Sequence, residues 1–172
     1  MSAPDIFLSY NREDAAVAKT FADAFTREGL GVWWDATLRS GEAYDEVTEA
    51  ALRGARAVVV LWSPRSVVSR WVRAEATIAD RNRTLMPVTI EPCERPVMFE
   101  LTQTADLAHW NGETRDPAWR AFLADVHRFV DAKPGPARSP LATAPAPRSP
   151  ELEKRPSIAV LPFVNRSGLG ED

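Results

Sequence analysis

The chain has 172 residues, of which 45% are hydrophobic and 26% charged, and its formal net charge is −3 at pH 7. This composition is typical of a soluble globular protein, and the charge offers no basic surface that would favour nucleic acid as a partner. The single cysteine, Cys93, cannot form an intramolecular disulfide, and with two isolated histidines it supplies no metal-binding cluster. No apolar run is long enough to span a membrane, and the N-terminus lacks a secretory signal, so we expect a cytoplasmic protein.

The first elements predicted are a strand, a helix and a second strand. Residues 5–9 form a short apolar run without polar alternation, which suits a strand covered on both faces. Asn11 is a candidate N-cap for a helix that ends before Gly29. The apolar stripe of this helix consists of Val17, Ala18, Phe21, Ala22 and Phe25. Residues 30–35 are the second predicted strand, and a loop over 36–43 follows.

The middle of the chain contains the most strand-like run. A second helix is predicted over 42–53, with Val47, Ala50 and Ala51 on its apolar side. Residues 56–62 hold consecutive Val and Leu residues without polar alternation, which predicts a central parallel strand. Ser69 is then expected to cap a third helix that carries Trp71 and Glu75. These two residues are four apart, so their side chains should project from the same helix face.

The remaining elements complete an alternating pattern. A fourth strand is predicted over 84–90, a long loop with room for one helical turn over 91–104, and a short fifth strand over 105–108. The last helix should run over 117–131, with Pro117 at its first position. Alternating strands and helices predict an α/β, flavodoxin-like, three-layer fold with a five-stranded parallel sheet of order 2-1-3-4-5 and helices on both faces. Its ligand crevice should lie at the carboxyl ends of strands one and three.

The composition changes after the last predicted helix. Half of the chain's fourteen prolines fall within residues 132–156, amid Ala, Ser and Thr, which is typical of an extended linker. Residues 157–172 then contain one further strand-like run. We therefore expect a domain over 1–131, a linker over 132–156, and the start of a second, truncated domain or a disordered tail over 157–172.

Several motifs of residues 5–131 occur in the order and spacing of one family. They are Ile6 to Tyr10 in the first strand, Trp34 and Asp35 at the end of the second, Leu38 and Gly41 in the next loop, Leu61 to Pro64 at the end of the third strand, and Ser69, Trp71 and Glu75 in the third helix. On these residues the chain resembles a bacterial TIR (Toll/interleukin-1 receptor) domain of the NAD-cleaving type. TIR domains act as self-associating adaptors or as enzymes that cleave nicotinamide from NAD+. The resemblance places Glu75 at the position of the essential glutamate and Trp71 at that of the usual aromatic residue.

One carboxylate is chemically sufficient for this reaction. Nicotinamide is cationic while bound to ribose and leaves as a neutral molecule, so the second carboxylate of ordinary glycosidases is not required. Glu75 would stabilise the oxocarbenium-like transition state. Trp71 and Trp34 could cover flat rings, Tyr10 could line the crevice rim, and Arg12 could meet the pyrophosphate. The full predicted substrate-binding set is Tyr10, Arg12, Trp34, Asp35, Leu38, Gly41, Ser63 and Trp71.

Other interpretations of these residues stay open. Glu75 could be a solvated helix residue, and Trp71 could pack in the core. Of the adjacent pair Trp33 and Trp34, which should point to opposite sheet faces, Trp33 is the expected core residue. Asp35 could cap a loop and Ser63 could serve only a turn. A phospho-receiver, which shares the architecture, is excluded because Trp62 and Ser63 stand where the acceptor aspartate would be.

The sequence therefore predicts an NAD+ glycohydrolase or cyclase that forms ADP-ribose or a cyclic ADP-ribose in bacterial immune signalling. NAD+ would be the substrate, and no separate cofactor is expected. Activity should require self-association through TIR–TIR contacts that include loop 35–43, and a module beyond the linker would supply the trigger. The alternative is a non-enzymatic TIR–TIR adaptor that uses the same loop.

Overall fold

The computed structural model describes residues 3–34 and 46–132. In chain order its elements are β1 (Ile6–Ser9), the 3-10 turn η1 (Arg12–Asp14), α1 (Ala15–Arg27), β2 (Val32–Trp33), α2 (Glu46–Gly54), β3 (Ala57–Trp62), α3 (Arg70–Arg81), β4 (Leu85–Thr89), α4 (Val97–Glu100), β5 (Ala105–Asp106) and α5 (Pro117–Ala132). The predicted loop 36–43 and the segments after residue 132 lie outside the described residues. No helix in the described ranges is long and apolar enough to cross a membrane.

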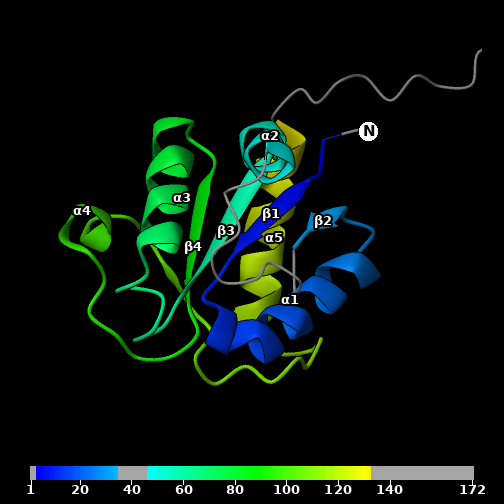
Figure 1. Ribbon diagram of the computed structural model, residues 1–172. Helices are drawn as coiled ribbons and strands as arrows, with labels where there is room; N and C mark the ends of the chain where they lie inside the picture. The colour runs from blue at the N-terminus through cyan, green and yellow to red at the C-terminus, as the bar shows by residue number, and fades with distance from the viewer. Residues whose placement is uncertain (1–2, 35–45, 133–172) are drawn as a thin grey trace, which may run out of the picture. The chain divides into compact units, whose positions relative to one another are not determined.

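The strands form one parallel sheet of five strands in the order β2-β1-β3-β4-β5 (Figure 1). The predicted fold class and strand order are confirmed. β1 and β3 are neighbours at the centre, with Ser9 of β1 opposite Val60 of β3. The chain leaves β1 towards β2 and leaves β3 towards β4, in opposite directions across the sheet. The carboxyl ends of β1 and β3 therefore lie at the switch point where such folds bind ligands.

Alternate residues of the inner strands face two separate cores. Ile6, Leu8, Val59 and Leu61 pack with α1 and α5 on one face of the sheet. Phe7, Val58, Val60 and Trp62 pack with α2, α3 and Phe99 of α4 on the other face. β3 is completely buried along its length, as its unbroken apolar sequence predicted. The result is the predicted three-layer arrangement, in which successive side chains of a strand serve opposite layers.

The buried face of α1 agrees with the prediction except at Val17, whereas the buried face of α2 is rotated from the predicted one. In α1, Val17 is 38% exposed, and the buried side is formed by Ala18, Phe21, Ala22, Ala24 and Phe25. In α2, Val47 is 59% exposed, whereas Thr48, Ala51 and Leu52 are buried. Residues 48, 51 and 52 have the spacing of one helix face, so burying Ala51 and Leu52 also buries a threonine and turns Val47 to solvent.

The edge strands are shorter than predicted. β2 covers only Val32–Trp33 of the predicted 30–35, and β5 only Ala105–Asp106 of the predicted 105–108. Among the described strands, β2 pairs only with β1, and β5 only with β4. Each edge strand therefore has hydrogen bonds on one side alone, and it ends where these bonds end. Trp33, the expected core tryptophan, is half-buried and stacks on Phe7 with ring centroids 4.7 Å apart. Gly29 follows α1 with a φ of 81°, the left-handed conformation expected of a residue that ends a helix.

Candidate active site

Glu75 is positioned by the start of α3. Ser69 caps this helix, as predicted, and its side chain accepts a hydrogen bond from the backbone N–H of Val72. α3 packs on β1, β3 and β4, so the face that carries position 75 meets the end of the sheet. There the Ser9 hydroxyl, at the last position of β1, donates a hydrogen bond of 2.5 Å to the Glu75 Oε2 atom. A carboxylate is thereby held at the carboxyl edge of the central strands.

The environment of this carboxylate disfavours its charge. Burial raises the pKa of Glu75 to about 7, and the hydrogen bond from Ser9 offsets part of this effect. The residue as a whole keeps some solvent contact, whereas its carboxylate end is largely surrounded by protein atoms. A solvated surface carboxylate would have neither a bond to β1 nor a raised pKa. The surface interpretation of Glu75 is therefore wrong.

Trp71 lies one helical turn before Glu75 and is open to solvent. Its relative exposure is 57%, whereas Val72, Ala76 and Ala79 of the same helix are buried. The interpretation of Trp71 as a core residue is therefore wrong for this chain. An indole that is more than half exposed therefore lies one helical turn from the Glu75 carboxylate.

The other predicted substrate-binding residues fall into separate groups. Tyr10 and Trp34 are half-buried, and their rings are tilted at a centroid distance of 6.3 Å, where the chain leaves β1 and β2. Arg12 is exposed in η1. Ser63 is completely buried directly after β3. Asp35, Leu38 and Gly41 lie outside the described residues, so their predicted roles remain predictions.

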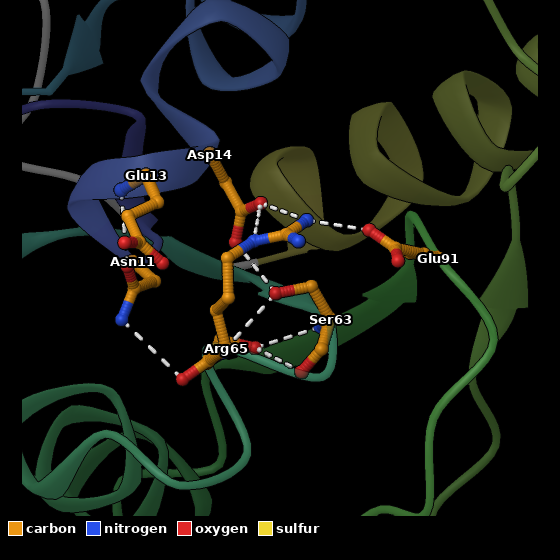
Figure 2. Close-up of polar contacts among 7 residues, drawn as sticks. Asn11, Glu13, Asp14, Ser63, Arg65 and Glu91 are labelled. Atoms are coloured by element: carbon orange, nitrogen blue, oxygen red, sulfur yellow. Dashed lines mark hydrogen bonds and ion pairs between the residues drawn. The ribbon is translucent and has the colours of Figure 1, made fainter.

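A polar cluster that the sequence did not predict lies at the same edge of the sheet (Figure 2). We call it the Asp14 network: Asp14, Ser63, Arg65 and Glu91. The Ser63 hydroxyl donates to Asp14 Oδ2 at 2.5 Å, and Arg65 Nε donates to Asp14 Oδ1 at 2.7 Å. The Nη2 atom of Arg65 also lies 2.5 Å from Glu91 Oε2. The guanidinium of Arg65, in the loop after β3, therefore links the segment after β1 with the segment after β4.

The residues of the Asp14 network bond to one another and so stabilise the loops at this edge of the sheet. The Asp14 side chain is only 2% exposed, so its charge depends on the partners it has inside the protein. The hydrogen bonds with Asp14 and then Glu91 raise the pKa of Arg65 further above its usual value. The hydroxyl of Ser63 is engaged by Asp14, and its backbone N–H donates to the Ser66 hydroxyl at 2.7 Å. This arrangement favours the turn interpretation of Ser63 over direct substrate contact.

Asn11 connects the same region from the first loop. Its side chain caps η1 by accepting from the backbone N–H of Glu13, as an N-cap should, and its Nδ2 donates to the Arg65 carbonyl at 3.3 Å. The sequence predicted Asn11 as the cap of the first long helix; it caps the 3-10 turn η1 instead, and Asp14 stands at the N-cap position of α1. The contact with Arg65 was not predicted. Within residues 3–34 and 46–132, no three His, Cys, Asp or Glu side chains are arranged to hold a metal ion.

The comparison with known families agrees with this geometry. A sequence profile described as TIR domain matches residues 6–123. The chain belongs to the TIR domain family. No curated protein is significantly similar to it.

Two solved structures share the architecture of this TIR domain. The crystal structure of the TIR domain of the Toll-related receptor TRR-2 from Hydra magnipapillata is 20% identical, with 73% of this chain and 99% of that chain covered and a TM-score of 0.61. A metazoan TIR-STING receptor from C. gigas, in complex with 2′,3′-cGAMP, is also 20% identical, with a TM-score of 0.56. That match covers 75% of this chain and 40% of the receptor. At this identity the two similarities concern the fold alone.

Proposed function

We propose that this TIR domain cleaves the glycosidic bond between nicotinamide and ribose in NAD+, with Glu75 as the catalytic carboxylate. The observation that carries the proposal is the position of Glu75. Its carboxylate is desolvated, is bonded to Ser9 at the end of β1, and lies one helical turn from the exposed ring of Trp71. A carboxylate with a raised pKa at the switch point of a parallel sheet is a functional-site candidate on physical grounds.

The chemistry suits a single acidic group. The bond between ribose C1′ and the nicotinamide nitrogen breaks, its electron pair stays on nitrogen, and nicotinamide leaves neutral. Positive charge then develops on the ribose ring, where the Glu75 carboxylate can stabilise it. Attack by water releases a proton and gives ADP-ribose. Attack by a nucleophile of the same molecule, an adenine nitrogen or a ribose hydroxyl, gives a cyclic ADP-ribose.

The electrostatics of the free site favour a cation. Burial raises the pKa of Glu75, which means that its negative charge is poorly compensated in the protein. A bound nicotinamide riboside group is cationic and would supply the missing compensation. The same carboxylate would then interact most strongly with the oxocarbenium-like transition state, where the positive charge is spread over the ribose ring.

Aromatic side chains and Arg12 lie in the elements that lead to and from the proposed site. Trp71 offers an exposed indole, Tyr10 and Trp34 pair at the neighbouring edge, and Arg12 is exposed in η1. We assign the aromatic residues to the rings of NAD+ and Arg12 to its pyrophosphate. Loop 35–43 would complete the site, in this copy or in a neighbouring one.

Replacing Trp71 by alanine should weaken NAD+ binding without unfolding the domain. The side chain is 57% exposed, so its removal should change the free energy of unfolding by less than about 1 kcal/mol. Loss of the ring contact should raise the dissociation constant for NAD+ about tenfold, measured by calorimetry. Val47→Ala, which shortens an exposed side chain on α2, is the matched control and should leave NAD+ affinity unchanged. Unaltered NAD+ affinity in Trp71→Ala would remove this residue from the binding site.

The pH dependence of nicotinamide release should follow the ionisation of Glu75. The active form is the carboxylate, and its pKa is about 7. We therefore expect kcat/KM to fall about tenfold for each pH unit below 7 and to level off above 7. The measurement is nicotinamide release by chromatography between pH 5.5 and 8.5, with circular dichroism to verify that the protein stays folded. A profile that is flat across this range would mean that Glu75 does not act in its ionised form.

A non-enzymatic adaptor is the second candidate, and an exposed apolar surface on α4 is compatible with it. α4 exposes Val97, Met98 and the residue after the helix, Leu101, with relative exposures of 83%, 56% and 99%. Exposed apolar groups of this kind are typical of protein contacts. The same surface also fits the self-association that we propose for the enzyme, with a module beyond residue 132 as the trigger, so it does not separate the two functions.

The deciding experiment is incubation of the purified chain with NAD+, in dilute solution and tethered at high density on beads. We expect nicotinamide release that increases on tethering, because neighbouring copies would complete the site. Separation of the products distinguishes hydrolysis from cyclisation. If the tethered wild-type protein releases no nicotinamide, the adaptor function replaces the enzymatic one. An enzyme of this kind would fit bacterial immune signalling.

A further inference from the structure

Ser9 occupies a position where a polar side chain requires an explanation. It is the last residue of β1 and is 1% exposed. Successive strand residues point to opposite faces, so Ser9 points to the same face as Phe7, the face covered by α2 and α3. The preceding residues of the strand, Ile6, Phe7 and Leu8, are all apolar. A buried hydroxyl is costly unless it is hydrogen-bonded, and its partner here is Glu75.

The contact joins two elements that are distant in the sequence. Ser9 and Glu75 are separated by 66 residues, and the bond from Ser9 Oγ to Glu75 Oε2 is 2.5 Å long. A strand end in the middle of a sheet is rigid, whereas a glutamate side chain has several rotatable bonds. The hydroxyl therefore selects one orientation of the carboxylate and supplies a donor to its charged form.

We propose that Ser9 is a positioning residue for Glu75, which fixes the carboxylate against the end of β1 and keeps it ionised for the cleavage of NAD+. This inference rests on the proposed function of Glu75. Ser9 itself need not touch the substrate. Its contribution is the geometry and the charge state of the carboxylate that does.

Among the groups that the structure describes around Glu75, the Ser9 hydroxyl is the one that favours the ionised form of its carboxylate. The ranges of β1, β3 and β4, on which α3 packs, contain no titratable side chain. α2 contributes Glu46, Glu49 and Arg53, of which the last two pair with each other. α3 itself carries Arg70, Arg73, Asp80 and Arg81, all exposed, and the chain after β1 carries Tyr10, Arg12, Glu13 and the paired Asp14. The causes that shift the pKa of Glu75 are burial and, in the opposite direction, Ser9.

The test follows the ionisation of Glu75 directly, without substrate. The full chain is labelled with 13C in its glutamate carboxyl groups, and the Glu75 signal is assigned by its absence in Glu75→Gln. In Ser9→Ala the midpoint of this titration should rise by about one pH unit, because a donor to the charged form is lost. Ser9→Thr retains a hydroxyl and should restore the wild-type midpoint. The matched control is Thr84→Val, because Thr84 is also buried and its hydroxyl donates to the Ala79 carbonyl at 3.2 Å, near the other end of α3.

The second measurement is the pH profile of kcat/KM for nicotinamide release. Its midpoint should move upward in Ser9→Ala together with the carboxyl titration, and should stay in place in Thr84→Val. An unchanged Glu75 titration in a folded Ser9→Ala protein overturns the proposal, as does a shifted titration with an unmoved profile in an active enzyme. If Ser9→Ala does not fold, Ser9→Cys supplies a weaker donor of similar size and should give a smaller upward shift; no shift overturns the proposal. Absence of nicotinamide release from wild type overturns the enzymatic function and the role of Ser9 in it, while the titration still decides whether Ser9 controls the carboxylate.

Discussion

Glu75→Gln is expected to release nicotinamide at least about a hundredfold more slowly than wild type and to be more stable above pH 7. Glutamine has the shape of the protonated acid but cannot carry the negative charge that stabilises the oxocarbenium-like transition state. The loss of rate should appear in kcat, since the substitution leaves intact the contacts that we propose for Trp71 and Arg12 with the substrate. Nicotinamide release from tethered protein is the measurement.

The gain in stability follows from the raised pKa of Glu75. In the folded protein this pKa is about 7, against an ordinary value of 4.5, so folding disfavours the ionised form. The resulting cost is absent below pH 4.5, grows as the pH rises from 4.5 to 7, and is complete above 7, where it is about 3 kcal/mol. Glutamine removes this cost and can still accept the hydrogen bond from Ser9. Thermal unfolding at pH 5 and pH 8 should therefore show a difference from wild type that is larger at pH 8.

The control for this prediction is Glu94→Gln, which removes an exposed glutamate in the loop before α4. It should leave both activity and the pH dependence of unfolding close to wild type. A stability difference for Glu75→Gln that is equal at the two pH values would show that the charge of Glu75 is not penalised by folding. Full activity in that variant would remove Glu75 from its proposed catalytic role.

Asp14→Ala is expected to destabilise the domain by about 3 kcal/mol. The Asp14 side chain is 2% exposed, and it accepts hydrogen bonds from both Ser63 and Arg65. Alanine leaves the buried Ser63 hydroxyl without its acceptor and removes the ion pair with Arg65. Removal of one partner from a buried charged network typically costs several kcal/mol. For a domain of this size the midpoint of thermal unfolding should fall by roughly 10 °C.

Asp23→Ala is the matched control, because it breaks an ion pair at the surface. Lys19 and Asp23 are 2.6 Å apart on α1, but their side chains are 62% and 51% exposed. Loss of this ion pair should lower the free energy of unfolding by at most about 0.5 kcal/mol. The double variant Asp14→Ala with Ser63→Ala should be less destabilised than the sum of the single changes, since the orphaned hydroxyl is also removed. Equal costs for Asp14→Ala and Asp23→Ala would mean that the Asp14 network does not stabilise the fold.

Local patterns in the sequence predicted most of the fold. The unbroken apolar run of β3 predicted a central parallel strand, and Ser69 and Gly29 marked helix ends correctly. These features depend on neighbours in the chain, which the sequence displays. The exposed Val47 and the buried Thr48 show the limit, because the buried face of α2 is chosen by its packing against β1 and α3.

The site was only partly predictable for a related reason. Helical spacing placed Trp71 and Glu75 on one face, and the resemblance to TIR domains singled out Glu75. Neither signal revealed Ser9 as its partner, and nothing in the chain marked Arg65 or Glu91. The contacts of these residues exist only once the strand order has brought their loops together. Single charged residues are common in loops, so the sequence alone could not identify them as site residues. Asp14 did have one signal, its place just after β1 at the ligand edge of the sheet.

The Asp14 network also bears on the order in which the domain folds. Its bonds join residues 49 apart in the chain, from Asp14 to Ser63, and 26 apart, from Arg65 to Glu91. Because these contacts connect loops that meet only when β1, β3 and β4 pair, we expect them to form after the transition state of folding. Weakening them should mainly accelerate unfolding and leave the folding rate nearly unchanged. We therefore expect the edge of the sheet that holds this network to assemble after the central strands have paired, and to open early when the domain unfolds.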